Sequence, residues 1–179
     1  MEVVAIQDQC EATAPRLLPD IDRHLRKAAV AYHDTQLAEQ HLLRALDMDP
    51  GCLNVYFSLY KFYFYKHRLA DAEHVTLIAL ETAAGQGGFD ADWSALTPES
   101  IVWSAINTPQ HFYLFSLKAL AFIRLRLGHT QNSRDILNKL RELDPLDTVG
   151  SSVIRDLAAG SEKTGTAARR DLAPAGIDG

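Results

Sequence analysis

The chain has 179 residues, of which 47% are hydrophobic and 23% are charged, which is ordinary for a globular protein that buries one sizeable core. Its net charge of -5 argues against sequence-independent binding to nucleic acid, because such binding needs a clustered excess of lysine and arginine. The N-terminus carries acidic residues where an export signal would be basic, and charged residues interrupt every apolar run before it reaches the length of a membrane span, so we expect a cytoplasmic protein without a membrane partner.

Apolar residues recur with a period near 3.6 along almost the whole chain, which predicts an all-α fold. We expect one helical domain over residues 15–159. Residues 1–14 show no such period and are expected to form an N-terminal arm. Residues 160–179 are rich in glycine, alanine and charge and contain no aromatic residue, so we expect them to be a disordered tail.

The domain begins with two predicted helices, over residues 19–33 and 35–48. Asp20 can serve as the N-cap or as a first-turn acid of the first helix. Pro50 ends the second helix, because proline disfavours a helical conformation in the residue before it and has no N–H group to donate. The two segments are therefore expected to pair as a helical hairpin.

A second hairpin is predicted around a short break at residues 67–68, because apolar residues recur at helical spacing on both sides of it. Ala72 and Ala79 lie seven residues apart on the returning helix, where small side chains allow the backbones of paired helices to come close. Ala38 precedes Ala72 by the same interval by which Ala45 precedes Ala79. The two hairpins thus repeat with a constant period of about 34 residues, which lies in the range typical of helical repeat proteins.

Glycines and Pro98 then interrupt the pattern, which we interpret as an insertion over residues 87–113. Within the insertion, Thr97 followed by proline is a helix start signal, since threonine can cap a helix and proline is tolerated at its first position. The signal predicts an extra helix from Pro98 to about Asn107. The apolar residues that this helix would pack are Ile101, Val102 and Ile106.

Thr108 and Pro109 repeat the start signal and open a long predicted helix. Counting back from Pro145 by the same period places a third repeat over residues 114–147. A final helix over residues 148–159 would then cover the apolar face of the last repeat, as a finite array of repeats requires. Asp147 or Thr148 can cap this helix, and its apolar residues are Val149, Val153, Ile154 and Leu157.

The repeats resemble the tetratricopeptide repeat (TPR) family, whose helix-turn-helix unit has the same period. They fall at residues 19–52, 53–86 and 114–147, and the second matches the family motif through Tyr56, Leu59, Tyr63, Ala72 and Ala79. It departs from the motif at Tyr60, where the family prefers a small residue, and at Ala84, where proline is usual. The resemblance implies an α-solenoid of about three repeats, with an extra helix inserted between the second and third repeats and a C-terminal capping helix.

In the TPR family the first helix of each repeat lines a concave groove that binds a partner. The corresponding positions place cations beside apolar surface, at Arg23, Lys27, Asn54, Phe57, Lys61, Phe64, Tyr65, Phe115, Lys118, Phe122, Leu125 and Arg126. The resemblance therefore implies a non-enzymatic scaffold or chaperone-like adaptor that binds an apolar, partly acidic peptide or helix of another protein. The alternative is a self-assembling module whose groove is filled by its own insertion or cap, or by a second copy in a homodimer.

Three narrower resemblances bear on the ligand. The TPR proteins that grip a C-terminal carboxylate use a set of lysine, asparagine and arginine residues. Most of that set is missing here, where the corresponding residues are Arg23, Lys27, Ser58, Phe115 and Ala119, so we do not expect that ligand. The size and repeat number are similar to those of type III secretion chaperones. The run LYKFYFYKHRLADAE is similar to short TPR proteins encoded near nitrogen-fixation genes, which implies a bacterial accessory protein.

No motif points to catalysis, to a cofactor or to a metal. Several of the seven histidines fall at the turns between predicted helices, and none belongs to an HExxH-like pair. Asp90 and Asp92 supply too few ligands for Ca²⁺ or Mg²⁺. Cys10 and Cys52 fit no metal or redox spacing and are expected to be free thiols. We therefore expect a protein that is not an enzyme, with no cofactor, no metal and no nucleic-acid partner.

Overall fold

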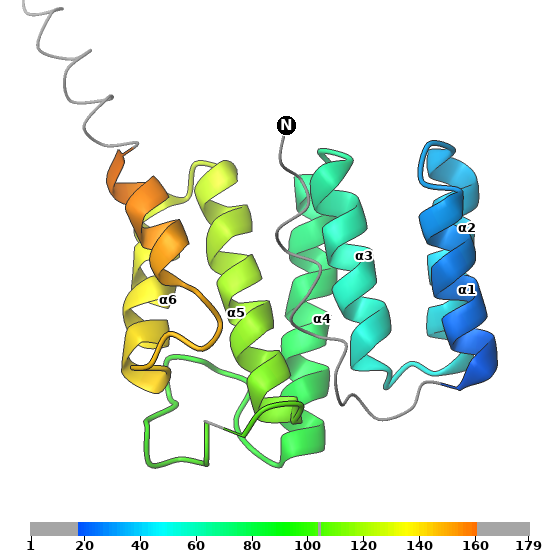
Figure 1. Cartoon of the computed structure of the whole chain (residues 1–179). Coiled ribbons are helices and arrows are strands. Elements are labelled where there is room, and N and C mark those ends of the chain that lie inside the picture. Colours follow the sequence, from blue (N-terminus) through cyan, green and yellow to red (C-terminus); the bar gives the residue numbers. More distant parts are fainter. Residues whose placement is uncertain (1–17, 104, 161–179) are drawn as a thin grey trace, which may run out of the picture.

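The computed structural model describes residues 18–103 and 105–160, and all regular structure within them is helical (Figure 1). The expected N-terminal arm and almost all of the expected tail lie outside these residues. The helices are α1 (Pro19–Val30), α2 (Thr35–Met48), α3 (Leu53–Tyr65), α4 (Leu69–Gly87), α5 (Pro109–Arg126) and α6 (Thr130–Leu143). A further helical segment spans residues 152–160. The all-α prediction is confirmed.

Local signals set most of the ends of the first hairpin, and one end differs from the prediction. Pro19 occupies the first position of α1, and Asp20 follows it as a first-turn acid. At the start of α2 the Asp34 side chain accepts a hydrogen bond from the Leu37 backbone N–H at 3.0 Å. The helix α1 ends at Val30, three residues before the predicted end, because the chain then turns with a hydrogen bond of 2.9 Å from the Asp34 N–H to the Ala31 carbonyl.

The second hairpin repeats the spacing of the first. α1 begins at Pro19 and α3 at Leu53, and the same interval separates the first residues of α2 and α4. The four alanines at positions 38, 45, 72 and 79 are all fully buried, as close backbone contact within each hairpin requires. Helices that follow one another in the chain pack against one another, so the six labelled helices form a row (Figure 1).

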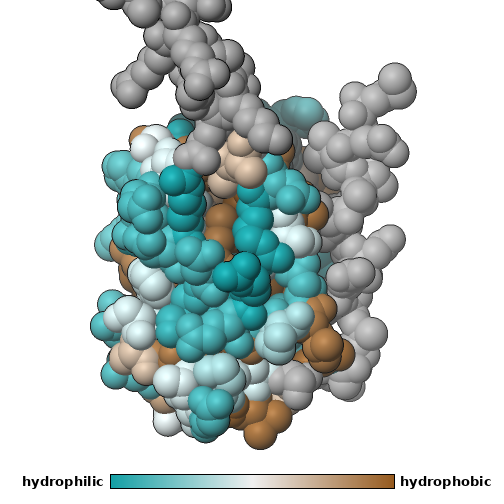
Figure 2. Space-filling model, turned by 90° about the vertical axis from the view of Figure 1, so that its left-hand side faces the viewer, coloured by the Kyte–Doolittle hydropathy of each residue, from teal (hydrophilic) through white to brown (hydrophobic). Residues whose placement is uncertain are grey.

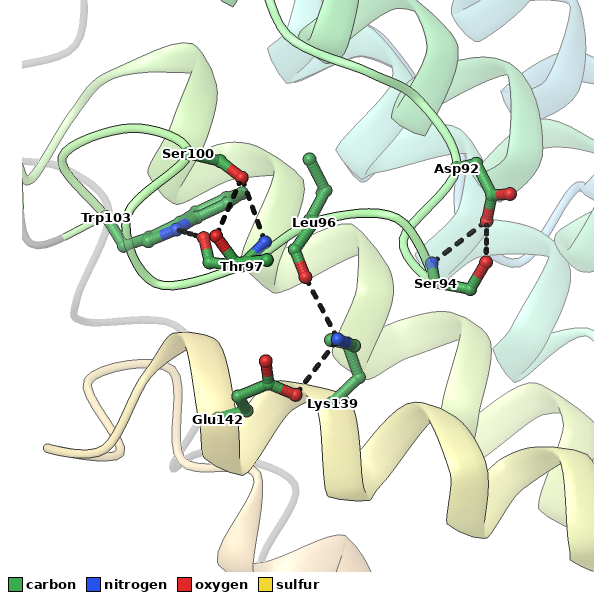
Figure 3. Close-up of polar contacts among 8 residues, drawn as sticks. All are labelled: Asp92, Ser94, Leu96, Thr97, Ser100, Trp103, Lys139 and Glu142. Carbon is green, nitrogen blue, oxygen red and sulfur yellow. Dashed lines mark hydrogen bonds and ion pairs between the residues drawn. The ribbon is translucent and has the colours of Figure 1, made fainter.

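The predicted helix from Pro98 to about Asn107 is wrong, because residues 98–103 and 105–107 form turns and bends. The Thr97 carbonyl, which a helix would use internally, instead accepts a hydrogen bond from the Ser100 N–H at 3.1 Å. It also accepts one from the Trp103 indole N–H at 3.0 Å (Figure 3). The buried side chains are Leu96 and Trp103, whereas two of the three predicted packing residues, Val102 and Ile106, are 71% and 66% exposed. Burial of the indole ring, not helix propensity, therefore sets the path of this segment.

The insertion is anchored to α5 and α6. The Lys139 Nζ of α6 donates a hydrogen bond to the Leu96 carbonyl at 2.9 Å and is held by an ion pair with Glu142, also at 2.9 Å (Figure 3). From α5, the Tyr113 hydroxyl donates to the Ala91 carbonyl at 2.7 Å. The insertion thus folds back over one end of α5 and α6 as an irregular but packed segment.

The final helix starts later than predicted, at residue 152. Asp147 and Gly150 adopt positive φ angles of 53° and 67°, which turn the chain before it can become helical. Asp147 lies before the final helix and caps its N-terminus, because its carboxylate accepts hydrogen bonds from the Ser151 and Ser152 N–H groups at 2.7 and 3.2 Å. Ile154 and Ala158 are buried with Val149, but the predicted packing residues Val153 and Leu157 are 60% and 50% exposed.

The buried apolar side chains form two clusters along the row. One cluster joins α1, α2, α3, the start of α4 and Ile123 of α5, and the other joins the rest of α4 and of α5 to the insertion, α6 and the final helix. The end of the row formed by α6 and the final helix presents a largely hydrophilic surface (Figure 2). Within the described ranges, no helix combines the length and apolar character needed to cross a bilayer.

Candidate functional site

Aromatic side chains of α3 and α5 meet along one side of the row. The ring of Phe64 packs against that of Phe122 with centroids 5.0 Å apart, and the ring of Phe57 lies 6.3 Å from that of Phe112. On α3, Phe57 and Phe64 are seven residues apart, which places them on the same side of the helix two turns from each other. The contacts therefore join the first helices of the second and third predicted repeats.

Two cations lie over these rings. The Lys61 Nζ is 4.9 Å from the centroid of the Phe57 ring, and the Arg126 guanidinium carbon is 5.7 Å from the centroid of the Phe64 ring. At these distances the positive charge is attracted to the electron-rich ring face. We call the surface formed by Phe57, Lys61, Phe64, Tyr65, Phe122 and Arg126 the aromatic face. All six residues belong to the predicted groove.

The aromatic face is built from two helices that contain no acidic residue. The sequence of α3 is LNVYFSLYKFYFY and that of α5 is PQHFYLFSLKALAFIRLR. The side chain of Tyr65 is 40% exposed, and the other three rings of the face are half-buried. Tyr60, which departs from the TPR motif, is buried with its ring 5.3 Å from that of Phe57 and so supports the face from within. The face can thus offer apolar surface together with positive charge.

The predicted groove residues Phe115 and Lys118, in the middle of α5, are covered by the segment that follows α6. The Lys118 ammonium donates a hydrogen bond to the Val149 carbonyl, in the loop after α6, and lies 5.0 Å from the centroid of the Phe115 ring. Desolvation by burial lowers the pKa of Lys118, although Asp147 and Asp144 act in the opposite direction. Phe115 and Leu125 pack against the α4–α6 core cluster. Lys118 and Phe115 therefore help to hold the C-terminal segment in place.

The other predicted groove residues lie apart from the aromatic face. Arg23, on α1, forms an ion pair of 2.9 Å with Asp20 of the same helix. Lys27 is exposed on α1, and Asn54 is half-buried in the first turn of α3, where its carbonyl accepts a hydrogen bond from Ser58. Within the described ranges, Arg23 and Lys27 therefore lie over no aromatic ring as Lys61 and Arg126 do.

A polar network between the first two hairpins was not predicted from the sequence. Arg68 pairs with Glu39 at 2.8 Å and with Asp71 at 2.7 Å, and the Tyr63 hydroxyl donates to the same glutamate at 2.9 Å. Burial, followed by the hydrogen bond to Glu39, raises the pKa of Tyr63 to about 12. The glutamate and the arginine stand 29 residues apart, so no local motif marks their contact.

A pair of histidines joins α1 to α2 and was also missed. The Nδ1 atoms of His24 and His41 lie 3.2 Å apart, within hydrogen-bonding distance. Desolvation lowers the pKa of His24 below its ordinary value of 6.5, and the nearby His41, Lys27, Arg44 and Arg23 lower it further. The folded chain therefore favours the neutral form of His24.

We expect this pair to make the protein less stable on mild acidification. Because the pKa of His24 is lower in the folded than in the unfolded chain, its contribution is present above about pH 6.5 and is lost as the pH falls below that value. Thermal melting between about pH 7.5 and about pH 5.5 should show this fall, and His24→Gln should reduce it. His111, whose pKa is also lowered, chiefly by desolvation, would keep part of the dependence. A variant with the full wild-type dependence would contradict the assignment to His24.

Within the part of the chain that the structure describes, no three histidine, cysteine, aspartate or glutamate side chains gather as metal ligands would. Asp92 instead accepts hydrogen bonds from the backbone N–H and hydroxyl of Ser94, at 2.9 and 2.7 Å (Figure 3). These bonds lower the pKa of Asp92. Its interactions therefore have a local structural explanation as a turn-forming residue.

The sequence is similar to that of a protein from Azotobacter chroococcum mcd 1, described as an uncharacterized 19.8 kDa protein in the nifW 5' region. The two are 32% identical over 124 residues, which cover 68% of this chain and 70% of the Azotobacter protein. No family model matches the chain. No solved structure matches it either.

Proposed function

This chain belongs to the same family as the Azotobacter chroococcum protein of the nifW 5' region, and from that premise we propose that it is an accessory protein of nitrogen fixation. We further propose that it is a TPR-like scaffold without catalytic activity of its own. Its ligand would be an apolar, partly acidic peptide or helix of another protein, bound on the aromatic face.

The repeat spacing supports the TPR-like part of the proposal. Both helices of the first hairpin recur in the second at one constant interval, which equals the length of the TPR unit. At the positions where TPR proteins pack paired helices through alanine, the first two repeats bury alanine, and the third buries Ser133 and Leu140. Burial at these positions is what the proposed frame requires, and it supports the proposal.

The observation that carries the binding proposal is that Lys61 of α3 and Arg126 of α5 lie over the α3 rings of Phe57 and Phe64, and that neither helix contains an acidic residue. Aromatic rings and arginine are enriched where proteins bind one another. A carboxylate placed beside these cations would gain charge-assisted hydrogen bonds, while an apolar side chain would cover the rings.

The proposal is tested by Lys61→Glu combined with Phe64→Ala. The chain is used to capture proteins from its native cell, and mass spectrometry identifies a partner that it enriches. Reversing one charge and truncating one central ring should weaken that partner's binding at least about thirtyfold, or by about 2 kcal/mol. The matched control is Arg141→Glu combined with Leu77→Ala, which makes the same kinds of change at exposed positions of α6 and α4. The control should bind like the wild type.

Thermal melting of the same variants separates binding from folding. Phe64 is half-buried and packs against the first core cluster, so the double variant should melt somewhat below the wild type but still unfold in one cooperative transition. If Phe64→Ala instead destabilises the chain by about 3–5 kcal/mol, the ring is part of the core and the face is not a binding surface. Equal capture by the wild type and a folded double variant would also contradict the proposal.

A further inference from the structure

We propose that the N-terminal segment of the chain itself, residues 1–15, docks on the aromatic face and competes with the external ligand. This inference rests on the proposed function, because it takes the aromatic face as the ligand-binding surface. It adds an intramolecular regulator, whose release would be required before a partner can bind.

Charge is the first argument. The α3 and α5 helices carry Lys61 and Arg126 at the face and contain no aspartate or glutamate. The N-terminal segment has the opposite character, with Glu2, Asp8 and Glu11 and no lysine or arginine before Arg16. Attraction between the segment and the face is therefore opposed by no like charge on either α3 or α5.

Apolar matching is the second argument. The segment begins MEVVAIQD, so that a run of four apolar residues, Val3 to Ile6, stands between two acids. This is the chemistry inferred for the external ligand, an apolar stretch flanked by carboxylates. Half-buried phenylalanine rings at the face offer such a run a surface that excludes water.

The other terminus fits less well. Residues 161–179 contain Lys163, Arg169 and Arg170 as well as acids, and they have no run of large apolar residues. The cations of that segment would be repelled by Lys61 and Arg126. Of the two parts of the sequence that flank the described residues, the N-terminal one is therefore the complementary segment.

Length permits the docking. The N-terminal segment joins the described structure at Leu18, directly before α1. A chain of 15 residues can span roughly 50 Å when extended. Packed helices lie about 10 Å apart, and the contacts from α1 through α2 and α3 to α5 make three such steps, so α1 and α5 are separated by at most roughly 30 Å. The segment can thus reach across α3 to the rings of α5, and its covalent attachment would give it an effective concentration on the order of millimolar.

The experiment uses the full chain and a synthetic peptide of residues 1–15 that carries a fluorescent label. The wild-type chain should bind this peptide weakly, because its own segment already covers the face. A full-chain variant with Val4→Asp and Ile6→Asp, whose own segment is no longer apolar, should bind the wild-type peptide at least about tenfold more tightly. Addition of Lys61→Glu and Phe64→Ala to that variant should remove the binding, and circular dichroism should show that each variant remains folded.

Three outcomes would overturn the inference. Equal affinity of the peptide for the wild type and the Val4→Asp, Ile6→Asp variant would show that the segment does not compete in the intact chain. No binding to either would show that the segment is not a ligand of the face. A wild-type dimer by light scattering that becomes a monomer in this variant would show that the segment docks on a second copy instead.

Partner capture separates this inference from the proposed function. If the peptide does not bind but capture still depends on Lys61 and Phe64, the face is a ligand site and only self-docking is lost. If the peptide binds as expected but capture is unaffected by Lys61→Glu with Phe64→Ala, the face serves the chain itself and the external partner binds elsewhere. Support for both requires the Val4→Asp, Ile6→Asp variant to capture the same identified partner several-fold more strongly than the wild type.

Discussion

Replacing Tyr113 by alanine should lower the free energy of unfolding by about 3–5 kcal/mol, the range for truncating a large buried aromatic side chain. Tyr113 is fully buried on α5, with its ring 5.1 Å from that of Phe89 and 6.2 Å from that of Trp103. Its hydroxyl also donates to the Ala91 carbonyl. The alanine variant would remove the ring that packs against Phe89 and Trp103 of the insertion, and it would leave a cavity between the insertion and α5.

The matched control is Tyr113→Phe, which keeps the ring and removes only the hydroxyl. Because a neutral hydrogen bond contributes little net stability, this variant should lose about 1 kcal/mol. Urea unfolding of the three proteins measures both differences. If Tyr113→Ala unfolds within about 1 kcal/mol of the wild type, the insertion does not pack on α5 as the structure describes it.

Helices were predictable where local signals and periodicity agreed. The predicted and observed bounds of α2 coincide, because Asp34 caps one end and Pro50 follows the other. The start of α5 was equally predictable, since the Thr108 hydroxyl accepts a hydrogen bond from the His111 N–H and Pro109 is tolerated in the first turn. In both cases the determining residues are neighbours in the sequence.

The insertion was mispredicted because a valid local signal lost to distant contacts. Thr97 followed by Pro98 is compatible with a helix start, but the Thr97 carbonyl is taken by the Trp103 indole. That indole is buried only because Phe89 and Tyr113 supply a pocket for its ring. The sequence shows that these three rings exist, but their meeting depends on how α4 and α5 pack.

The candidate site was predictable in part for the same reason. The spacing on α3 places Phe57, Lys61 and Phe64 together, and this required only helical geometry and the TPR frame. The coverage of Lys118 by the Val149 carbonyl was not predictable, since it depends on a turn with a positive φ angle at Asp147. Short-range periodicity thus predicts which residues share a face but not which other segment covers them.

Replacing Ile123 by alanine should destabilise the whole row by about 2–5 kcal/mol. Ile123 is only 1% exposed and lies on α5, yet it belongs to the core cluster of α1, α2 and α3, whereas its neighbours Leu117 and Leu120 belong to the other cluster. Ile123 therefore packs α5 against the core cluster of α1, α2 and α3. Loss of its side chain weakens this cluster itself and also the contact between the two core clusters.

The control for this prediction is Ile123→Val, which removes one methyl group and should cost about 0.5–1.5 kcal/mol. Calorimetry decides whether the halves unfold together: the wild type should give one transition, because the two clusters share α4 and α5. Ile123→Ala should shift that transition to lower temperature and, if the shared packing is what couples the halves, broaden or split it. A wild-type melting curve for Ile123→Ala would mean that the Ile123 side chain does not contribute to the first core, and that the aromatic contacts Phe57–Phe112 and Phe64–Phe122 are what couples α5 to α3.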